Sequence, residues 1–270
     1  MSEWHFMDPA SRHNLVTAWE REAAGMMTLA DDDTWEGATG AGAWQARDVF
    51  GHLVDTTEGY FVSFASARGE SDPPENLGVR HMSTYIDEGA RAFRGFDRKE
   101  LVDRLSEDLS RFRSIVDDLS DDQWAGMLVS HKYMGPLPAA FYPLFQLVDY
   151  GIHSWDIREG SGKAHALDGD TADLLAPLAF VLWQSTHEEP EPGEPYRIGI
   201  RVTGRNGGDN VVSVSPDRVA VEQGDLSPLP TVIEFDPGTL ILTAYGRMNG
   251  GTVRGDQALA ARFLNSCFRI

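Results

Sequence analysis

The spacing of apolar residues changes along the chain, and this change constrains the fold more than any other feature. Up to about residue 187, apolar residues recur at intervals of three and four, as in the series Leu101, Leu105, Leu109, Phe112 and Val116. That interval places them on one face of a helix. Beyond residue 195 apolar and polar residues alternate instead, which is typical of a half-buried strand. The pattern therefore predicts helices first and a small sheet-containing unit second.

An acidic, proline-rich segment, EEPEPGEP at 188–195, separates the two patterns. Such a composition favours an extended linker over regular structure. The chain has 270 residues, enough for two hydrophobic cores. We expect a fold of class α plus α+β, with a helical bundle over 1–188 and a small α+β domain over 189–270.

The composition disfavours several partners. The net charge of −19 would repel nucleic acid and anionic membranes. No apolar run approaches the roughly 18 residues that a membrane span needs, and MSEWHFMDPA does not resemble a signal peptide. Cys267, the one cysteine, cannot form an internal disulfide. We expect a soluble cytoplasmic protein, monomeric or homodimeric, that acts on a small molecule.

Three residues have the positions expected of metal ligands. Asp149 and His153 are four apart on a predicted helix, so their side chains project from the same face. His52 lies mid-helix in a different segment, beside apolar residues. Carboxylates facing a bundle interior are costly without a partner, and a metal ion would supply one.

Spacing alone does not require a metal ion at these residues. His52 could be a hydrogen-bonded core histidine, and Asp149 and His153 could form an ion pair on the helix surface. The other histidines fall in predicted loops, helix ends or exposed positions, where solvated or capping roles are expected: His5, His13, His81, His131, His165 and His187. The sequence lacks G-x-S-x-G, H-E-x-x-H, C-x-x-C and G-x-x-x-x-G-K-[ST] motifs, which disfavours serine, cysteine and nucleotide chemistry.

Ordered segments of the chain resemble a known family. AWQARDVFGHLVD, which contains Trp44-x7-His52, resembles the second-helix motif of the DinB-like family, and more narrowly that of the mycothiol-dependent maleylpyruvate isomerases. YGIHSWDIREG (150–160) is similar to that group's His-x-Trp-Asp segment. FDPGTLILTAYGR (235–247) and VRGDQALAARF (253–263) resemble its small sterol-carrier-like domain. The resemblance implies a DinB-like four-helix bundle followed by a sterol-carrier-like α+β domain.

The resemblance also implies a set of site residues. The family's metal triad falls on His52, Asp149 and His153, although the family's isomerase has glutamate at the position of Asp149. The shorter carboxylate would move the ion or leave room for water. Arg247 matches an arginine that the family places toward the active cleft, and Arg80 would supply a second cation.

Asp156 is the remaining candidate, three residues beyond His153. It would orient a metal ligand through a hydrogen bond, or cap a neighbouring backbone group.

The function implied is metal-dependent enzyme chemistry with a low-molecular-weight thiol, mycothiol, as cosubstrate. Two imidazoles and one carboxylate leave coordination positions open on zinc, the ion we expect, although nickel, cobalt or manganese would accept the same ligands. The thiolate would drive cis–trans isomerisation or S-transfer on an electrophilic substrate whose carboxylate Arg247 would hold. Two alternatives stay open: a hydrophobic-ligand-binding protein with a structural or vestigial metal site, and a thiol-independent metal-dependent hydrolase.

Overall fold

The structure is a computed structural model that describes residues 2–31, 33–163, 165–188, 193–216 and 218–268. It divides into two compact units, Met1–Leu167 and Asp168–Ile270. None of the described helices is long and apolar enough to cross a membrane.

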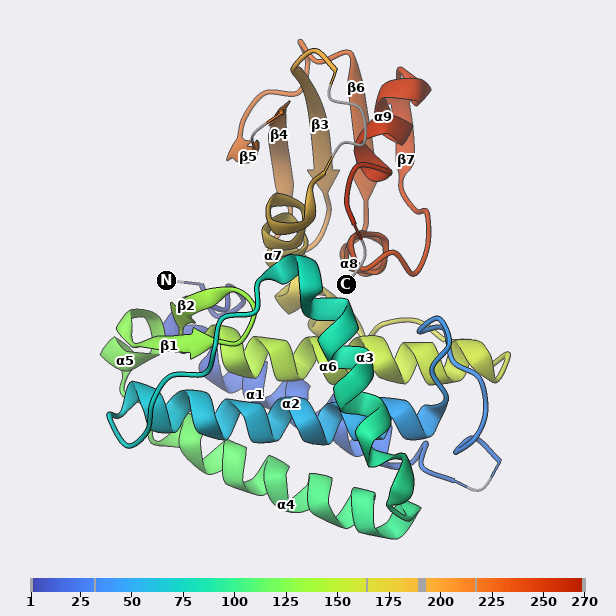
Figure 1. Cartoon of the computed structure of the whole chain (residues 1–270). Helices are drawn as coiled ribbons and strands as arrows, with labels where there is room; N and C mark the ends of the chain where they lie inside the picture. The colour runs from blue at the N-terminus through green and yellow to red at the C-terminus, as the bar shows by residue number, and fades with distance from the viewer. Residues whose placement is uncertain (1, 32, 164, 189–192, 217, 269–270) are drawn as a thin grey trace. The chain divides into compact units, whose positions relative to one another are not determined.

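The N-terminal unit is a four-helix bundle with short added elements (Figure 1). Its elements are η1 (Pro9–Ser11), α1 (Arg12–Met27), α2 (Ala46–Ala67), η2 (Val79–His81), α3 (Met82–Ala92), η3 (Phe93–Gly95), α4 (Arg98–Asp117), α5 (Asp121–Gly126), β1 (Leu128–His131), β2 (Gly135–Pro138) and α6 (Phe141–Gly160). The four long helices α1, α2, α4 and α6 make the bundle: α1 packs on α6, and α2 packs on both α4 and α6. The shorter α3 crosses α2.

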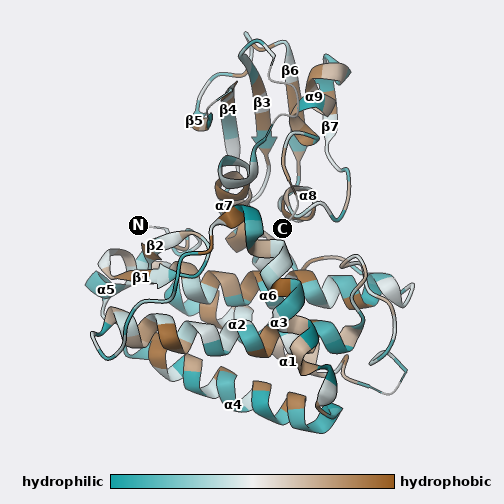
Figure 2. Cartoon of the chain, viewed as in Figure 1, coloured by the Kyte–Doolittle hydropathy of each residue, from teal (hydrophilic) through white to brown (hydrophobic). Residues whose placement is uncertain are grey.

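Large aromatic side chains fill the bundle core. Tyr60 and Phe64 of α2 meet Phe112 of α4 and Tyr142 of α6, with ring centroids 5.0–6.0 Å apart. Their edge-to-face and tilted arrangement is the favourable one for aromatic pairs. Figure 2 shows apolar residues recurring between hydrophilic ones along α4, as expected for a helix that turns one apolar face to the core. The core fixes α2 against α6, the two helices that carry the candidate ligands.

The C-terminal unit combines a five-stranded sheet with three helices among its described residues. Its elements are α7 (Gly169–Thr186), β3 (Tyr196–Val202), β4 (Gly208–Ser215), β5 (Arg218–Gln223), β6 (Thr231–Phe235), α8 (Pro237–Ala244), β7 (Thr252–Gly255) and α9 (Gln257–Leu264). The strand order is β5-β4-β3-β6-β7, and only the β3–β6 pair is parallel among these neighbours. The predicted α plus α+β class is thus confirmed.

The division between the units falls earlier than the predicted boundary at 188/189. Helix α7, which we expected in the bundle, belongs to the C-terminal unit because it packs against α8 and β5. Asp173 of α7 accepts a hydrogen bond from the backbone N–H of Arg205 at 3.0 Å. Trp183 of α7 packs on Phe263 of α9. Half of the predicted linker, residues 189–192, lies outside the described residues.

Candidate metal centre

The start of helix α2 is anchored by an ion pair between a buried aspartate and a partly exposed arginine. Asp48 is fully buried, and its carboxylate accepts two hydrogen bonds from the Arg94 guanidinium at 2.6 and 2.7 Å. It also accepts the backbone N–H of Gln45, the residue before the helix, at 2.9 Å. Burial alone would raise the pKa of Asp48, but these hydrogen bonds and the arginine charge lower it. Because His52 follows one turn later, this anchor fixes its position.

His52 meets Asp149 and His153 of α6 in the bundle. One ligand atom from each of the three residues lies within 4.8 Å of the other two. His52 Nε2 is 3.7 Å from Asp149 Oδ1, and the two imidazole centroids are 5.0 Å apart. His52 and His153 are 5% and 7% exposed, and the side chain of Asp149 is 18% exposed. The three residues predicted as ligands are therefore brought together in a largely buried place.

Both imidazoles are hydrogen-bonded through Nδ1. His153 Nδ1 lies 2.8 Å from Asp156 Oδ2, and Asp156 is fully buried. His52 Nδ1 lies 3.2 Å from the hydroxyl of Thr56, one turn along α2. A metal-bound histidine usually donates its other ring N–H to such an acceptor, which fixes the ring and its tautomer. Nε2 is therefore the nitrogen that each ring would present to a metal ion.

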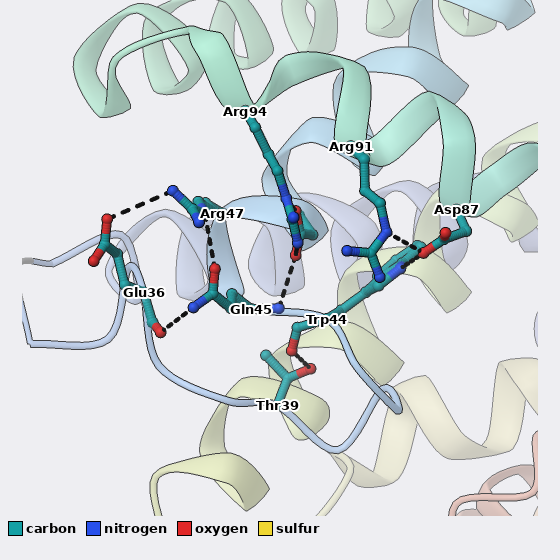
Figure 3. Close-up of polar contacts among 9 residues, drawn as sticks. Glu36, Thr39, Trp44, Gln45, Arg47, Asp87, Arg91 and Arg94 are labelled. Carbon is teal, nitrogen blue, oxygen red and sulfur yellow. Dashed lines mark hydrogen bonds and ion pairs between the residues drawn. The ribbon is translucent and has the colours of Figure 1, made fainter.

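Trp44 covers both imidazoles from the loop before α2. Its ring centroid is 5.3 Å from that of His52 and 5.7 Å from that of His153. The indole N–H donates to Asp87 Oδ1 of α3 at 2.8 Å, and the same oxygen accepts Arg91 Nε at 2.7 Å. Figure 3 shows Trp44 and Arg91 converging on Asp87. These hydrogen bonds hold the indole against the site and limit the freedom of both rings.

A divalent ion fits this donor set. Two neutral imidazoles and one carboxylate are the ligands of many catalytic zinc sites, and they leave coordination positions for water or substrate. The hydrogen bonds to Thr56 and Asp156 add the outer partners that such sites use. Without an ion, Asp149 would face the two rings in a largely buried place, at a cost in desolvation.

Two predicted site residues lie elsewhere in the chain. Arg80 is exposed in η2. Arg247 belongs to the C-terminal unit, in the turn after α8, where its backbone N–H donates to Leu242 O at 2.8 Å and its guanidinium donates to Tyr245 O at 3.1 Å. The structure thus places Asp156 beside the triad. For Arg247 it gives contacts within the C-terminal unit.

Sequence reasoning missed other residues at the site. His131, expected in a solvated or capping role, ends strand β1 with its ring 5.2 Å from that of Phe145. Burial lowers the pKa of His131 to about 4, so its ring is neutral at neutral pH. Trp44 stood in the recognised motif, but nothing in the sequence indicated that Asp87 would bind its indole. No short spacing links these residues, because they meet only through the packing of α3 and the β1–β2 hairpin on α2.

Comparisons with known proteins agree with this fold. The sequence profile of the family described as "Mycothiol maleylpyruvate isomerase N-terminal domain" matches residues 15–158. The chain is similar to the solved mycothiol-dependent maleylpyruvate isomerase, at 14% identity over 100% of both chains and a TM-score of 0.61. A variant of that enzyme with a histidine replaced by alanine gives 13% identity, 100% of both chains and a TM-score of 0.62.

A further solved structure shows a weaker likeness. The colibactin self-resistance protein ClbS, in complex with a dsDNA, matches 57% of this chain and 97% of its own, with 12% identity and a TM-score of 0.47. A score this low carries no argument about this chain. A search of the curated proteins finds no match to the sequence.

Proposed function

Because the chain belongs to the mycothiol maleylpyruvate isomerase N-terminal domain family, we propose that it is a metal-dependent enzyme that uses a low-molecular-weight thiol. The thiol is mycothiol, and the reaction is isomerisation or S-transfer on a small electrophilic substrate. The observation that carries the proposal is the approach of His52, Asp149 and His153, whose ligand atoms lie within 4.8 Å of one another. The similarity in fold to a solved mycothiol-dependent isomerase supports it further.

His52, Asp149 and His153 would hold the ion, with zinc first among the candidates. A divalent ion supplies a positive charge that lowers the pKa of a nearby thiol, so that its nucleophilic thiolate forms near neutral pH. Asp156 accepts the Nδ1 hydrogen of His153 and so keeps that ring oriented. Thr56 does the same for His52.

The surroundings of the triad would exclude bulk water. Trp44 packs against both rings in a tilted orientation, and both imidazoles are buried. Exclusion of water strengthens the electrostatic interactions at the site and protects a thiolate from competing protonation.

Arg247 is proposed to bind a carboxylate of the substrate, because a guanidinium forms two parallel hydrogen bonds with a carboxylate. Arg80 is the second candidate for this role. An Arg247→Gln variant is expected to raise the KM for a carboxylate substrate and to leave the metal content unchanged.

The proposal is tested on purified full-length protein in three steps. The metal content is measured first, and about one ion per chain is expected for the wild type and for His13→Ala, an exposed-histidine control on α1. His52→Ala is expected to lose the ion. Turnover of maleylpyruvate is then measured with and without mycothiol, and after removal of the metal with a chelator.

Each outcome of the turnover assay has a defined meaning. Turnover that needs both metal and thiol supports the proposal. Full activity of the metal-free protein contradicts it, and metal-dependent turnover without any thiol identifies a hydrolase instead. A cytoplasmic location and a monomeric or homodimeric state belong to the same proposal, and light scattering of the purified chain tests the latter.

A further inference from the structure

Helix α3 supplies none of the three predicted metal ligands, yet it lies against the helix that carries the first of them. A Cβ atom added at Gly51 of α2 would lie 2.5 Å from the carbonyl oxygen of Ala90. Because that oxygen belongs to the backbone of α3, a larger side chain at residue 51 would push the whole helix away. Gly51 directly precedes His52, so this contact brings α3 close to the metal centre.

Asp87 extends from α3 to the aromatic side chain that covers the triad. Its Oδ1 accepts the indole N–H of Trp44 at 2.8 Å and Nε of Arg91 at 2.7 Å (Figure 3). The hydrogen bonds from Trp44 and Arg91 outweigh burial and lower the pKa of Asp87, so the carboxylate is charged at neutral pH. A hydrogen bond to a charged acceptor is stronger than one between neutral groups. Asp87 therefore holds the indole more firmly than an uncharged acceptor would.

The loop that carries Trp44 is fixed at its other end to α6. The backbone N–H of Gly40 donates to Asp156 O at 2.8 Å, and Thr39 Oγ1 donates to Trp44 O at 2.9 Å. Trp44 itself is only half-buried, so packing restricts its indole less than it restricts the fully buried rings of the bundle core. The backbone of the loop is thus held by its own contacts, whereas the orientation of the indole depends on Asp87.

The indole of Trp44 packs against the imidazoles of both candidate histidines. Its ring centroid lies 5.3 Å from that of His52 and 5.7 Å from that of His153. The hydrogen bonds at Nδ1, to Thr56 and Asp156, fix one atom of each imidazole but allow the ring to pivot about it. Contact with the indole opposes this pivoting. Since ligands that are held in place bind an ion more tightly than mobile ones, the indole contributes to metal affinity.

We propose that Asp87 is a positioning residue of the metal centre: through Trp44 it holds the imidazoles of His52 and His153 in the orientation that binds the ion. Asp87 acts through the indole and is not itself a ligand. Its side chain is 43% exposed, so a role in the packed core of the bundle does not account for it. The proposal rests on the proposed function for the presence of the ion, but the restraint on the two rings exists in the metal-free protein as well.

The first test measures zinc affinity by competition with a chromophoric chelator. Asp87→Ala is expected to weaken zinc binding about tenfold, the lower limit for the loss of a partner that orients a metal ligand. Asp87→Asn keeps an acceptor oxygen for the indole N–H and is expected to recover most of that affinity. Glu88→Gln is the matched control, because it changes an exposed carboxylate next to Asp87 on α3, and it should bind zinc as the wild type does. Wild-type affinity in a folded Asp87→Ala protein would overturn the proposal.

A double-mutant cycle tests whether Asp87 acts through Trp44. Trp44→Phe keeps an aromatic ring but has no N–H for Asp87 to accept. In the Trp44→Phe protein, the further change Asp87→Ala is therefore expected to alter zinc affinity less than about twofold. A tenfold loss in both backgrounds would contradict the proposal, because Asp87 would then act by a route that does not include the indole.

The metal-free protein provides a test that does not depend on the proposed function. The ring current of an indole shifts the NMR signals of nearby C–H groups, so Trp44 marks the imidazole signals of His52 and His153. Asp87→Ala is expected to move these signals in both histidines, and Glu88→Gln is not. Unchanged imidazole signals in Asp87→Ala would overturn the proposal. Moved signals in a protein that binds no divalent ion would refute the proposed function alone, and leave the restraint by Asp87 in place.

Discussion

The Asp156→Asn substitution tests how the bundle supports its metal ligands. Asp156 is fully buried, and its Oδ2 accepts the Nδ1 hydrogen of His153 at 2.8 Å. Asparagine has nearly the same shape, so the backbone and packing of α6 are expected to stay the same. The change removes the negative charge that polarises the imidazole and raises its basicity toward a metal.

The expected loss of metal affinity follows from this single contact. Removal of the partner of a metal-bound histidine typically weakens metal binding by about 10–100-fold. This range corresponds to about 1.4–2.8 kcal/mol in binding free energy. Since Asp156 is buried and its hydrogen bond is short, we expect a value in the upper half of the range. The effect should be larger than that of Thr56→Val, which removes a neutral partner at 3.2 Å.

The assay is competition for zinc between the metal-free protein and a chromophoric chelator. Glu159→Gln is the matched control, because Glu159 is an exposed carboxylate on the same helix. Circular dichroism and urea unfolding of the metal-free proteins separate a loss of affinity from a loss of fold. Wild-type affinity in a folded Asp156→Asn protein would refute the role given to Asp156.

Three further changes test other parts of the structure. Asp149→Glu should keep zinc affinity within about tenfold of the wild type, whereas Asp149→Ala should lose the ion, as calorimetric titration will show. Arg94→Ala should lower the free energy of unfolding by about 2 kcal/mol in urea melts, since it leaves the buried Asp48 carboxylate without its partner; an unchanged midpoint would contradict this. Burial and the charge of Glu58 raise the pKa of Asp108 to about 6, so the ionisation of this one carboxyl group should cost about 1 kcal/mol of unfolding free energy as the pH rises from about 4 to 6. Asp108→Asn should abolish that cost, and identical pH profiles of the two proteins would speak against it.

The architecture of the chain could be predicted because its apolar patterns are long. The helical spacing predicts a helix from Ala46 to Arg68, and α2 is observed at Ala46–Ala67. The alternation after residue 195 likewise predicts a strand, which is observed at Tyr196–Val202. Short elements were missed: β2 has four residues and two prolines, and β7 also has four, too few for either period to be recognised.

The boundary between the units could not be predicted because α7 is apolar enough to pack on either core. What assigns it to the C-terminal unit is non-local, namely the contacts of Asp173 and Trp183 with residues far along the sequence.

Only part of the candidate site could be predicted from the sequence. The spacing of Asp149 and His153 places both on one face of α6, but no spacing relates them to His52, and that link came from the family resemblance. The contacts of Trp44 with the two imidazoles, and of its indole with Asp87, depend on a loop and on α3. Contacts of this kind arise from tertiary packing, which local patterns do not encode.

The most direct test of the proposed metal centre is anomalous diffraction from crystals of the zinc-loaded protein, measured on both sides of the zinc edge. We predict one strong peak per chain, about 2.0–2.2 Å from Nε2 of His52, Nε2 of His153 and a carboxylate oxygen of Asp149. No peak among these three side chains, or a zinc ion bound at other residues, would contradict the metal centre.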